Sequence, residues 1–186
     1  AQQSCSRMEL EYLDLLYVHW PILHYEAETT LPAFENLVRD GLVKHIGLSN
    51  YTIELLEEAR SVLDESIFAV QVEMHPLLQQ ERILEYAQKH DIWLVAYSPL
   101  ARGRVFDIPE IQSVAEKHDI SEAQVAIAWL LSKDNVRVIP KATSEEHLRD
   151  NLHALDVELA DEDLARIDAI DREQRFVDRD NAPWDE

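Results

Sequence analysis

The sequence predicts an α/β fold with a parallel β-sheet. Five short apolar runs rich in valine, isoleucine, leucine and aromatic residues recur along the 186 residues, and amphipathic stretches separate them. The runs are nearly unbroken instead of alternating with polar residues, which is typical of strands covered by helices on both faces. Strands that alternate with helices pair in parallel, so the pattern favours repeated β-α units.

The elements follow one another in a regular order. Strands are predicted over residues 14–20, 44–50, 67–74, 92–99 and 136–142. Helical stretches are predicted over 29–41, 52–64, 80–91 and 108–134, followed by two more helices over 144–155 and 160–170. In the helix over 52–64, Leu55, Leu56, Ala59 and Val62 have the spacing of one apolar face. The polar residues 171–186 are expected to form a C-terminal loop or arm.

Several residues predict where these helices begin and end. Asn50 or Thr52 can cap the helix over 52–64. Ser121 with Gln124 three residues later is typical of a capping box, so a helix is expected to start there within 108–134. Gly41 lies where the helix over 29–41 should stop.

The charge of the chain is strongly negative. It has 37 acidic and 17 basic residues, which gives a formal net charge of −20. Such a surface repels nucleic acid and anionic membranes, so neither is expected as a partner. Two interpretations remain open: ordinary solvated acidic helix faces, or halophilic adaptation to molar salt, where screening over about 3 Å removes the self-repulsion.

Length and composition predict one cytoplasmic domain spanning residues 1–186. A chain of 186 residues buries a sizeable core, and no apolar run reaches the ~20 residues needed to span a bilayer. No signal peptide is visible. The one cysteine, Cys5, excludes an internal disulfide framework and fits a reducing compartment.

Two parallel architectures fit the β-α pattern: an open doubly wound sheet and an incomplete β/α barrel. The glycine-rich phosphate turn GxGxxG of dinucleotide-binding open sheets is absent, because the chain has only Gly41, Gly47 and Gly103. This argues against an open sheet that binds nucleotides.

Polar or aromatic residues lie at the end of each predicted strand. They are His19 and Trp20; Ser49 and Asn50; Gln71 and Glu73; Tyr97 and Ser98; and Lys141 and Thr143. Each has a structural explanation, such as a helix cap, a hydrogen bond to backbone, core packing or a surface charge. Because the carboxyl ends of parallel strands lie at one edge, the set together predicts a functional site.

The same residues lie in stretches that resemble the aldo-keto reductases. The stretches are YLDLLYVHWP (12–21), LVRDGLVKHIGLSNY (37–51), VQVEMHPLLQQERILEYAQKHDIWLVAYSPLARG (70–103) and VIPKATSEEHLRDN (138–151). The resemblance runs in order over residues 8–170. It implies an incomplete TIM-type (β/α) barrel of about five β-α units, corresponding to strands 4–8 of the family barrel. It also implies hydride transfer between NADPH and a carbonyl or alcohol.

The resemblance assigns the nicotinamide end of the cofactor to four residues. Ser49, Asn50 and Gln71 match the residues that hydrogen-bond the carboxamide, and Tyr97 matches the aromatic residue that stacks on the ring.

The resemblance also assigns the phosphate-binding positions. They are Ser98, Leu100 and Arg102 for the pyrophosphate and Lys141, Ala142 and Thr143 for the adenosine 2′-phosphate.

The adenosine end departs from the family pattern. Asp150 and Asn151 match residues near the adenine, but Ala142 and His147 stand where the family has serine and arginine. An imidazole in place of a permanently charged guanidinium weakens one phosphate contact. We therefore expect NADPH as the cofactor with relaxed discrimination, so that NADH is accepted as well.

The catalytic assignment by resemblance covers only one of the family's four catalytic residues. His19 matches the histidine beside the substrate carbonyl, where an imidazole can donate a hydrogen bond to the developing alkoxide, and Trp20 matches a wall of the substrate pocket. The tyrosine, lysine and aspartate of the family precede the matched region. We therefore expect an N-terminally truncated chain with impaired activity.

The sequence also allows two classes of function other than a carbonyl reductase. One is a non-catalytic nucleotide-binding or interaction module built on a partial barrel. The other is a barrel hydrolase or metal enzyme, which is disfavoured because His19 and His24 lack carboxylate partners at convincing spacing, so no metal site is predicted. The substrate is expected to be a small-molecule carbonyl, and open barrel edges predict self-association.

Overall fold

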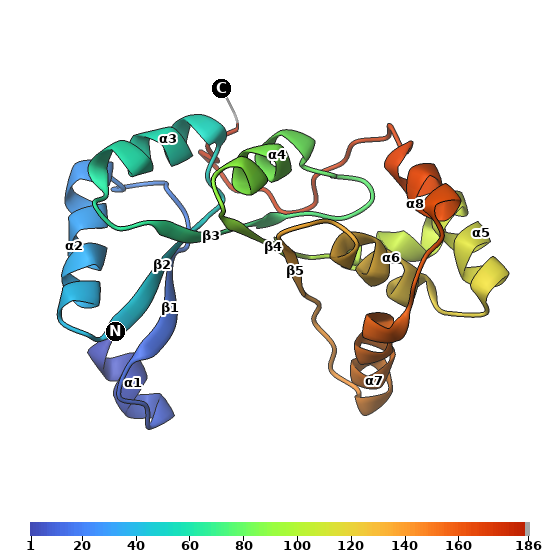
Figure 1. Ribbon diagram of the computed structural model, residues 1–186, viewed down its shortest axis with the longest axis horizontal. Coiled ribbons are helices and arrows are strands. Elements are labelled where there is room, and N and C mark those ends of the chain that lie inside the picture. The colour runs from blue at the N-terminus through green and yellow to red at the C-terminus, as the bar shows by residue number, and fades with distance from the viewer. Residues whose placement is uncertain (185–186) are drawn as a thin grey trace. The chain divides into compact units, whose positions relative to one another are not determined.

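The computed structural model describes residues 1–184 of the chain, which form two compact units (Figure 1). Unit 1 contains Ala1–Val72, Glu85–Trp93 and the chain from Arg179 onward. Unit 2 contains Glu73–Leu84 and Leu94–Asp178.

The five predicted strands are all present and form a parallel sheet. They are β1 (Leu13–Val18), β2 (Val43–Ser49), β3 (Ile67–Glu73), β4 (Trp93–Tyr97) and β5 (Val136–Ile139), in the sheet order β1-β2-β3-β4-β5. The predicted α/β class with a parallel sheet is confirmed. Each strand ends one to three residues before its predicted end, because the polar residues that were counted into the strands belong to the loops that follow.

Apart from the first, at residues 2–8, which helical spacing did not predict, the helices lie at the predicted helical stretches. They are α1 (Gln2–Met8), α2 (Ala27–Arg39), α3 (Ile53–Val62), α4 (Glu81–Lys89), α5 (Pro109–His118), α6 (Glu122–Leu131), α7 (Glu145–His153) and α8 (Asp161–Asp168). Two 3₁₀ segments, η1 (Ala101–Asp107) and η2 (Ala154–Asp156), were not predicted. Residues 171–184 contain neither helix nor strand.

In unit 1, parallel strands pack beneath two helices. β1 pairs with β2 from Leu13↔Val43 to Val18↔Leu48, and β2 pairs with β3. Helices α2 and α3 lie next to each other, and α2 also packs on β2 (Figure 1). Leu31 of α2, Leu48 of β2 and Leu56 of α3 are completely buried, so one apolar layer joins these elements.

In unit 2, the buried helix α6 is the centre around which the other elements pack. It contacts α5, α7 and β5, and eight of its ten residues are buried. Trp129 is fully buried, and its indole N–H donates a 2.8 Å hydrogen bond to Asp168 Oδ1 at the end of α8. Helix α7 contrasts with α6, because none of its residues is buried and Leu148 and Leu152 are exposed.

The helix boundary signals are confirmed at the residues named for them. Ser121 and Gln124 form the capping box of α6. It follows a left-handed Asp119 (φ 54°) that ends α5, so the stretch 108–134 contains two helices. Gly41 follows α2 with a φ of +73°, a conformation that glycine adopts without strain. Thr52, not Asn50, caps α3 by accepting a hydrogen bond from Leu55 N–H.

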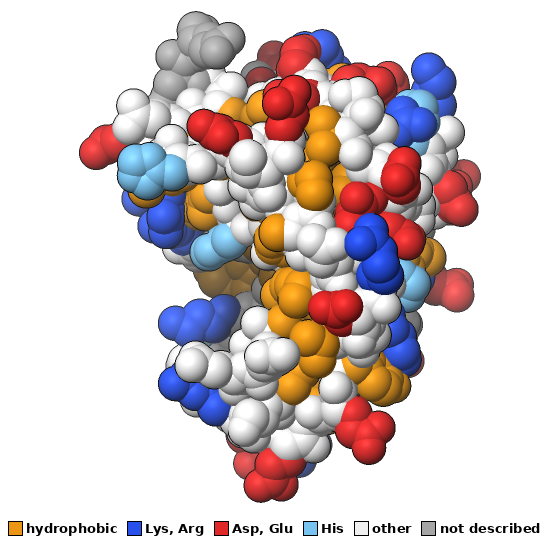
Figure 2. Space-filling model, turned by 90° about the vertical axis from the view of Figure 1, so that its left-hand side faces the viewer, with side chains coloured by type: hydrophobic (Ala, Val, Ile, Leu, Met, Phe, Trp, Pro, Cys, Tyr) orange, Lys and Arg blue, Asp and Glu red, His pale blue; other side chains and the backbone are white. Residues whose placement is uncertain are grey.

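Acidic residues are spread over the face of the molecule that Figure 2 shows. Figure 2 shows aspartate and glutamate side chains scattered across the face it presents, with lysine and arginine between them. Such an arrangement is typical of solvated helix faces. Within residues 1–184, no helix combines the length and the apolar character needed to cross a bilayer.

Candidate active site

In unit 1, hydrogen bonds made by Asn50 join the carboxyl ends of three strands. The Asn50 side-chain amide donates to the backbone oxygen of His19, which follows β1, at 3.0 Å and to Ser49 Oγ at 3.1 Å. The Asn50 backbone N–H donates to the backbone oxygen of Gln71 in β3 at 2.9 Å. The structure therefore brings four predicted site residues together: His19, Ser49, Asn50 and Gln71.

The backbone conformation of Asn50 suits this role. Asn50 is 2% exposed and has a φ of 63°, in the left-handed region that asparagine tolerates better than most residues. Since Thr52 already caps α3, the buried amide of Asn50 can point back toward β1. Its position is thus fixed by conformation and hydrogen bonding together.

A tyrosine that the sequence did not single out lies beside this cluster. The Tyr17 ring covers Gly47, where an ideal Cβ would come within 2.4 Å of Tyr17 Cε1. Only glycine leaves room for this ring. Burial raises the pKa of Tyr17, and its hydrogen bond with the Gln71 side chain opposes part of that rise. Tyr17 therefore supports Gln71 while keeping its proton.

His19 is exposed beside an aromatic wall. Its ring lies 6.5 Å from that of Trp20, and the Trp20 ring lies 5.5 Å from that of Trp184. The guanidinium carbon of Arg179 lies 5.1 Å from the centroid of the Trp20 ring, within cation–π range. Trp20 was predicted as a pocket wall, and Trp184 extends it from the C-terminal segment.

In unit 2, a pocket of about 480 Å³ brings together four predicted cofactor residues. Ser98, Leu100 and Arg102 follow β4, and Lys141 follows β5. Pro99, Gly103 and Phe106 complete the lining. The pocket thus has two cations and apolar walls, and its volume lies in the range of small-molecule sites.

The loop that forms this pocket has an unusual backbone. The φ angles are 50° at Ser98, 47° at Ala101, 53° at Arg102 and 91° at Gly103. Left-handed conformations at non-glycine residues cost about 1–2 kcal/mol each and persist only where the surroundings enforce them. Here Ala101 is fully buried, and Ala101 N–H and Gly103 N–H donate to the backbone oxygens of Ser98 and Leu100 at 2.8 Å. Such enforced strain is typical of functional loops.

Tyr97, at the end of β4, keeps its proton. Burial and the negative charge of Glu73 raise the pKa of Tyr97 to about 12, against the opposing charges of Arg175 and Arg102. A phenol with this pKa is a poor proton donor near neutral pH. Tyr97 is therefore suited to stacking through its ring and unsuited to acid catalysis.

Glu73 binds backbone N–H groups, which is one of the structural explanations that the sequence analysis gave for residues at the strand ends. Its buried carboxylate accepts hydrogen bonds from His75 Nε2 at 3.1 Å, Phe176 N–H at 3.0 Å and Val177 N–H at 2.9 Å. Burial alone raises the pKa of Glu73, but these hydrogen bonds outweigh it and the net pKa is lowered. Glu73 therefore anchors the segment before the C-terminus as a carboxylate.

Several predicted residues lie outside the unit 2 pocket. Ala142, Thr143, His147 and Asn151 do not line it, and neither does Asp150. The Asp150 carboxylate accepts a 2.7 Å hydrogen bond from Ser121 Oγ, and its backbone oxygen accepts one from the Gln124 amide at 3.3 Å. Asp150 thus docks α7 on the capping box of α6, and its predicted place near the adenine stays a prediction.

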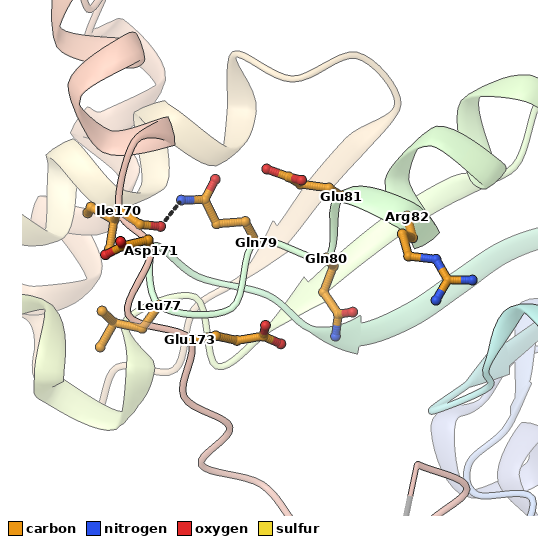
Figure 3. A pocket seen from close by; sticks show the side chains of 8 residues that line it. All are labelled: Leu77, Gln79, Gln80, Glu81, Arg82, Ile170, Asp171 and Glu173. Atoms are coloured by element: carbon orange, nitrogen blue, oxygen red, sulfur yellow. Dashed lines mark hydrogen bonds between the residues drawn. The ribbon is translucent and has the colours of Figure 1, made fainter.

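A second cavity in unit 2 has the wrong charge for phosphate. It has a volume of about 330 Å³ and is lined by residues of the 77–82 loop and of 170–173. Figure 3 shows Gln79 donating to the Ile170 backbone oxygen, with Glu81, Asp171 and Glu173 around the space and Arg82 beyond. Three carboxylates and one guanidinium repel a polyanion, so the pocket beside Arg102 and Lys141 is the better phosphate site.

Sequence reasoning missed Tyr17, Phe106 and Trp184. Tyr17 lies within a predicted strand, and no pattern shows that its ring covers Gly47. Phe106 lies in η1, a segment with no helical or strand period. The sequence signal that could have pointed to Phe106 is an aromatic residue shortly after the Arg102-Gly103-Arg104 turn.

Replacing Asn50 separates the stability that its side-chain hydrogen bonds provide from the stability that depends on its left-handed backbone conformation. We expect Asn50→Gly to lower the free energy of unfolding by about 1–2 kcal/mol through the lost amide hydrogen bonds. Asn50→Ala should lose about 1 kcal/mol more, because alanine is strained at a φ of 63°. Urea titrations of both variants measure the difference. Equal stability of the two variants, or an alanine variant as stable as the original chain, would contradict the conformational role.

Acid should release the segment that Glu73 holds. The folded pKa of Glu73 lies below that of a free glutamate, so its stabilising contribution is complete above about pH 5 and is lost as pH falls through the folded pKa. We expect amide hydrogens of Phe176 and Val177 to lose exchange protection as the pH falls below that range. Glu73→Gln should show weakened protection already at pH 7, whereas Glu81→Gln, at an exposed position, should not. Unchanged protection in Glu73→Gln would refute this role.

Comparisons with known proteins show the family to which the chain belongs. The model of the aldo/keto reductase family matches residues 1–172. The chain is 37% identical over 174 residues to the glyoxal reductase of Bacillus subtilis strain 168, a match that covers 94% of this chain and 62% of that protein. It is 34% identical over 189 residues to the methylglyoxal reductase DkgB of Escherichia coli O157:H7, covering 99% of this chain and 70% of that protein.

A solved structure is similar over the same part. The thermostable aldo-keto reductase Tm1743, in complex with the inhibitor epalrestat, superposes with a TM-score of 0.84 at 38% identity and covers 90% of this chain and 63% of that one. The chain thus spans 62% of the glyoxal reductase, 70% of DkgB and 63% of Tm1743. Together, the strand-end residues and the family match over residues 1–172 show that this chain belongs to the aldo/keto reductase family.

Proposed function

We propose that this chain binds NADPH and carries the cofactor face of a carbonyl reductase. The observation that carries the proposal is the pocket of about 480 Å³ in which Ser98, Leu100, Arg102 and Lys141 come together. The lining of this pocket has two cations and no carboxylate, although the chain has a net charge of −20. A guanidinium and an ammonium together suit the pyrophosphate and the 2′-phosphate of this dinucleotide.

The residues of unit 1 suit the reacting end of the cofactor. Ser49 and Gln71 offer a hydroxyl and an amide beside Asn50, and we assign them to the nicotinamide carboxamide. The flat ring of Tyr97 is assigned to stacking on the nicotinamide, which supplies the hydride when it is bound. These assignments rest on the family resemblance as well as on the geometry within each unit.

His19 and the aromatic wall are assigned to the substrate. A ring N–H of the exposed His19 donates a hydrogen bond to the substrate carbonyl oxygen, which polarises it as negative charge develops. Trp20 and Trp184 form an apolar surface next to it. The names of the glyoxal and methylglyoxal reductases support small aldehydes with an adjacent carbonyl as the substrate class.

A fluorescence titration with NADPH in molar KCl tests the proposal. We expect saturable quenching, weakened roughly tenfold or more by Tyr97→Ala, because stacking of a base on an aromatic ring is worth about 1–3 kcal/mol. Tyr97→Phe is the matched control, since it keeps the ring and should bind within about threefold of the original chain. A folded chain without saturable binding would refute the proposed function. Binding without turnover would support the non-catalytic nucleotide-binding alternative.

The ratio of the affinities for NADPH and NADH tests which residues contact the 2′-phosphate of the cofactor. Lys141→Ala should lower the affinity for NADPH and leave that for NADH nearly unchanged, whereas Lys89→Ala, which removes the same charge from α4, should change neither. His147→Arg should raise the ratio of NADPH to NADH affinity roughly tenfold, through about 1–2 kcal/mol from a charged phosphate contact. A ratio unchanged by His147→Arg would show that His147 does not face the phosphate.

A further inference from the structure

Phe106 lies in the unit 2 pocket without a structural reason of its own. Its side chain is 45% exposed, and among residues 1–184 no other aromatic ring is in contact with it. A buried phenylalanine would contribute packing energy, but this ring leaves much of its apolar surface in water. A single exposed apolar residue is ordinary in a folded protein. Whether Phe106 has a binding role is therefore decided by the residues that line the pocket with it.

The backbone at Phe106 is firmly held. Its neighbour Val105 is fully buried, and Ile108 is 3% exposed and donates its N–H to the Val105 oxygen at 3.3 Å. The Phe106 backbone oxygen accepts a 2.8 Å hydrogen bond from the Gln112 amide of α5. The segment η1 is thus anchored on both sides of Phe106, which holds the backbone that carries the ring in a fixed place at the pocket.

The pocket pairs this ring with two cations. Phe106, Arg102 and Lys141 line the same space, and Gly103 has no Cβ to narrow it. Protein sites for nucleotides combine an aromatic face, on which any base can stack, with cations that meet the phosphates. An aromatic ring beside a guanidinium and an ammonium therefore fits a phosphorylated nucleoside better than it fits an isolated phosphate.

We propose that Phe106 is the adenine-binding face of this pocket: the base of NADPH lies against the Phe106 ring while Lys141 meets the 2′-phosphate of the same nucleoside. The inference rests on the proposed function and deepens it. Lys141 and Phe106 line one pocket, so the end of the dinucleotide that carries the 2′-phosphate is the end that Phe106 contacts.

The experiment compares the two halves of the cofactor as separate probes. Dissociation constants of NADPH, adenosine 2′,5′-bisphosphate and reduced nicotinamide mononucleotide are measured by calorimetry for the original chain, Phe106→Ala and Phe106→Tyr. Leu23→Ala is the matched control, because Leu23 is 82% exposed and lies in unit 1. Circular dichroism checks that each variant keeps its helices.

We expect Phe106→Ala to weaken NADPH and adenosine 2′,5′-bisphosphate roughly tenfold. Reduced nicotinamide mononucleotide should stay within about twofold, and Phe106→Tyr and Leu23→Ala should bind all three like the original chain. Unchanged binding of the bisphosphate in Phe106→Ala, or equal weakening of both half-cofactors, would overturn the adenine assignment and leave the proposed function standing. A chain that binds neither NADPH nor the bisphosphate would overturn the proposed function itself.

Discussion

The buried carboxylate of Glu73 is the constraint on which much of unit 2 depends. It ends β3, accepts hydrogen bonds from His75 and from two backbone N–H groups of residues 176–177, and contributes to the raised pKa of Tyr97. A buried charge is tolerated only when hydrogen bonds compensate for the lost hydration. Once Glu73 is ionised and paired, the segment 174–178 is fixed and Tyr97 is kept as a neutral ring.

Asn50 plays a comparable part in unit 1. Its left-handed backbone and its buried amide connect the residues that end β1, β2 and β3, so the polar groups at these strand ends share one hydrogen-bonded framework. In unit 1, then, a buried polar side chain organises the strand ends that carry the candidate site, whereas in unit 2 Glu73 fixes the segment before the C-terminus. Preorganised groups of this kind bind a ligand without paying for their own ordering.

Patterns local in sequence predicted most of the fold. The apolar runs gave the strands, and Ser121 with Gln124 gave the start of α6, because both signals act over a few residues. The strand-end rule predicted Ser98 and Lys141 as site residues, and the resemblance to the aldo-keto reductases added Leu100 and Arg102; the structure places all four in one pocket. The roles of Phe106 and Tyr17 could not be predicted, because each depends on partners that only the folded backbone provides. For Glu73 a hydrogen bond to backbone was foreseen, but its partners were not. These partners lie about a hundred residues away.

The proposed function places the adenosine phosphates of NADPH in the pocket formed by η1 and the residues after β5. Hydrogen–deuterium exchange of the chain with and without saturating NADPH tests it most directly. We expect new protection over residues 98–106 and 141–147, with residues 77–82 around the acidic cavity unchanged. Protection centred on 77–82, or bound NADPH without any change over 98–106, would contradict it.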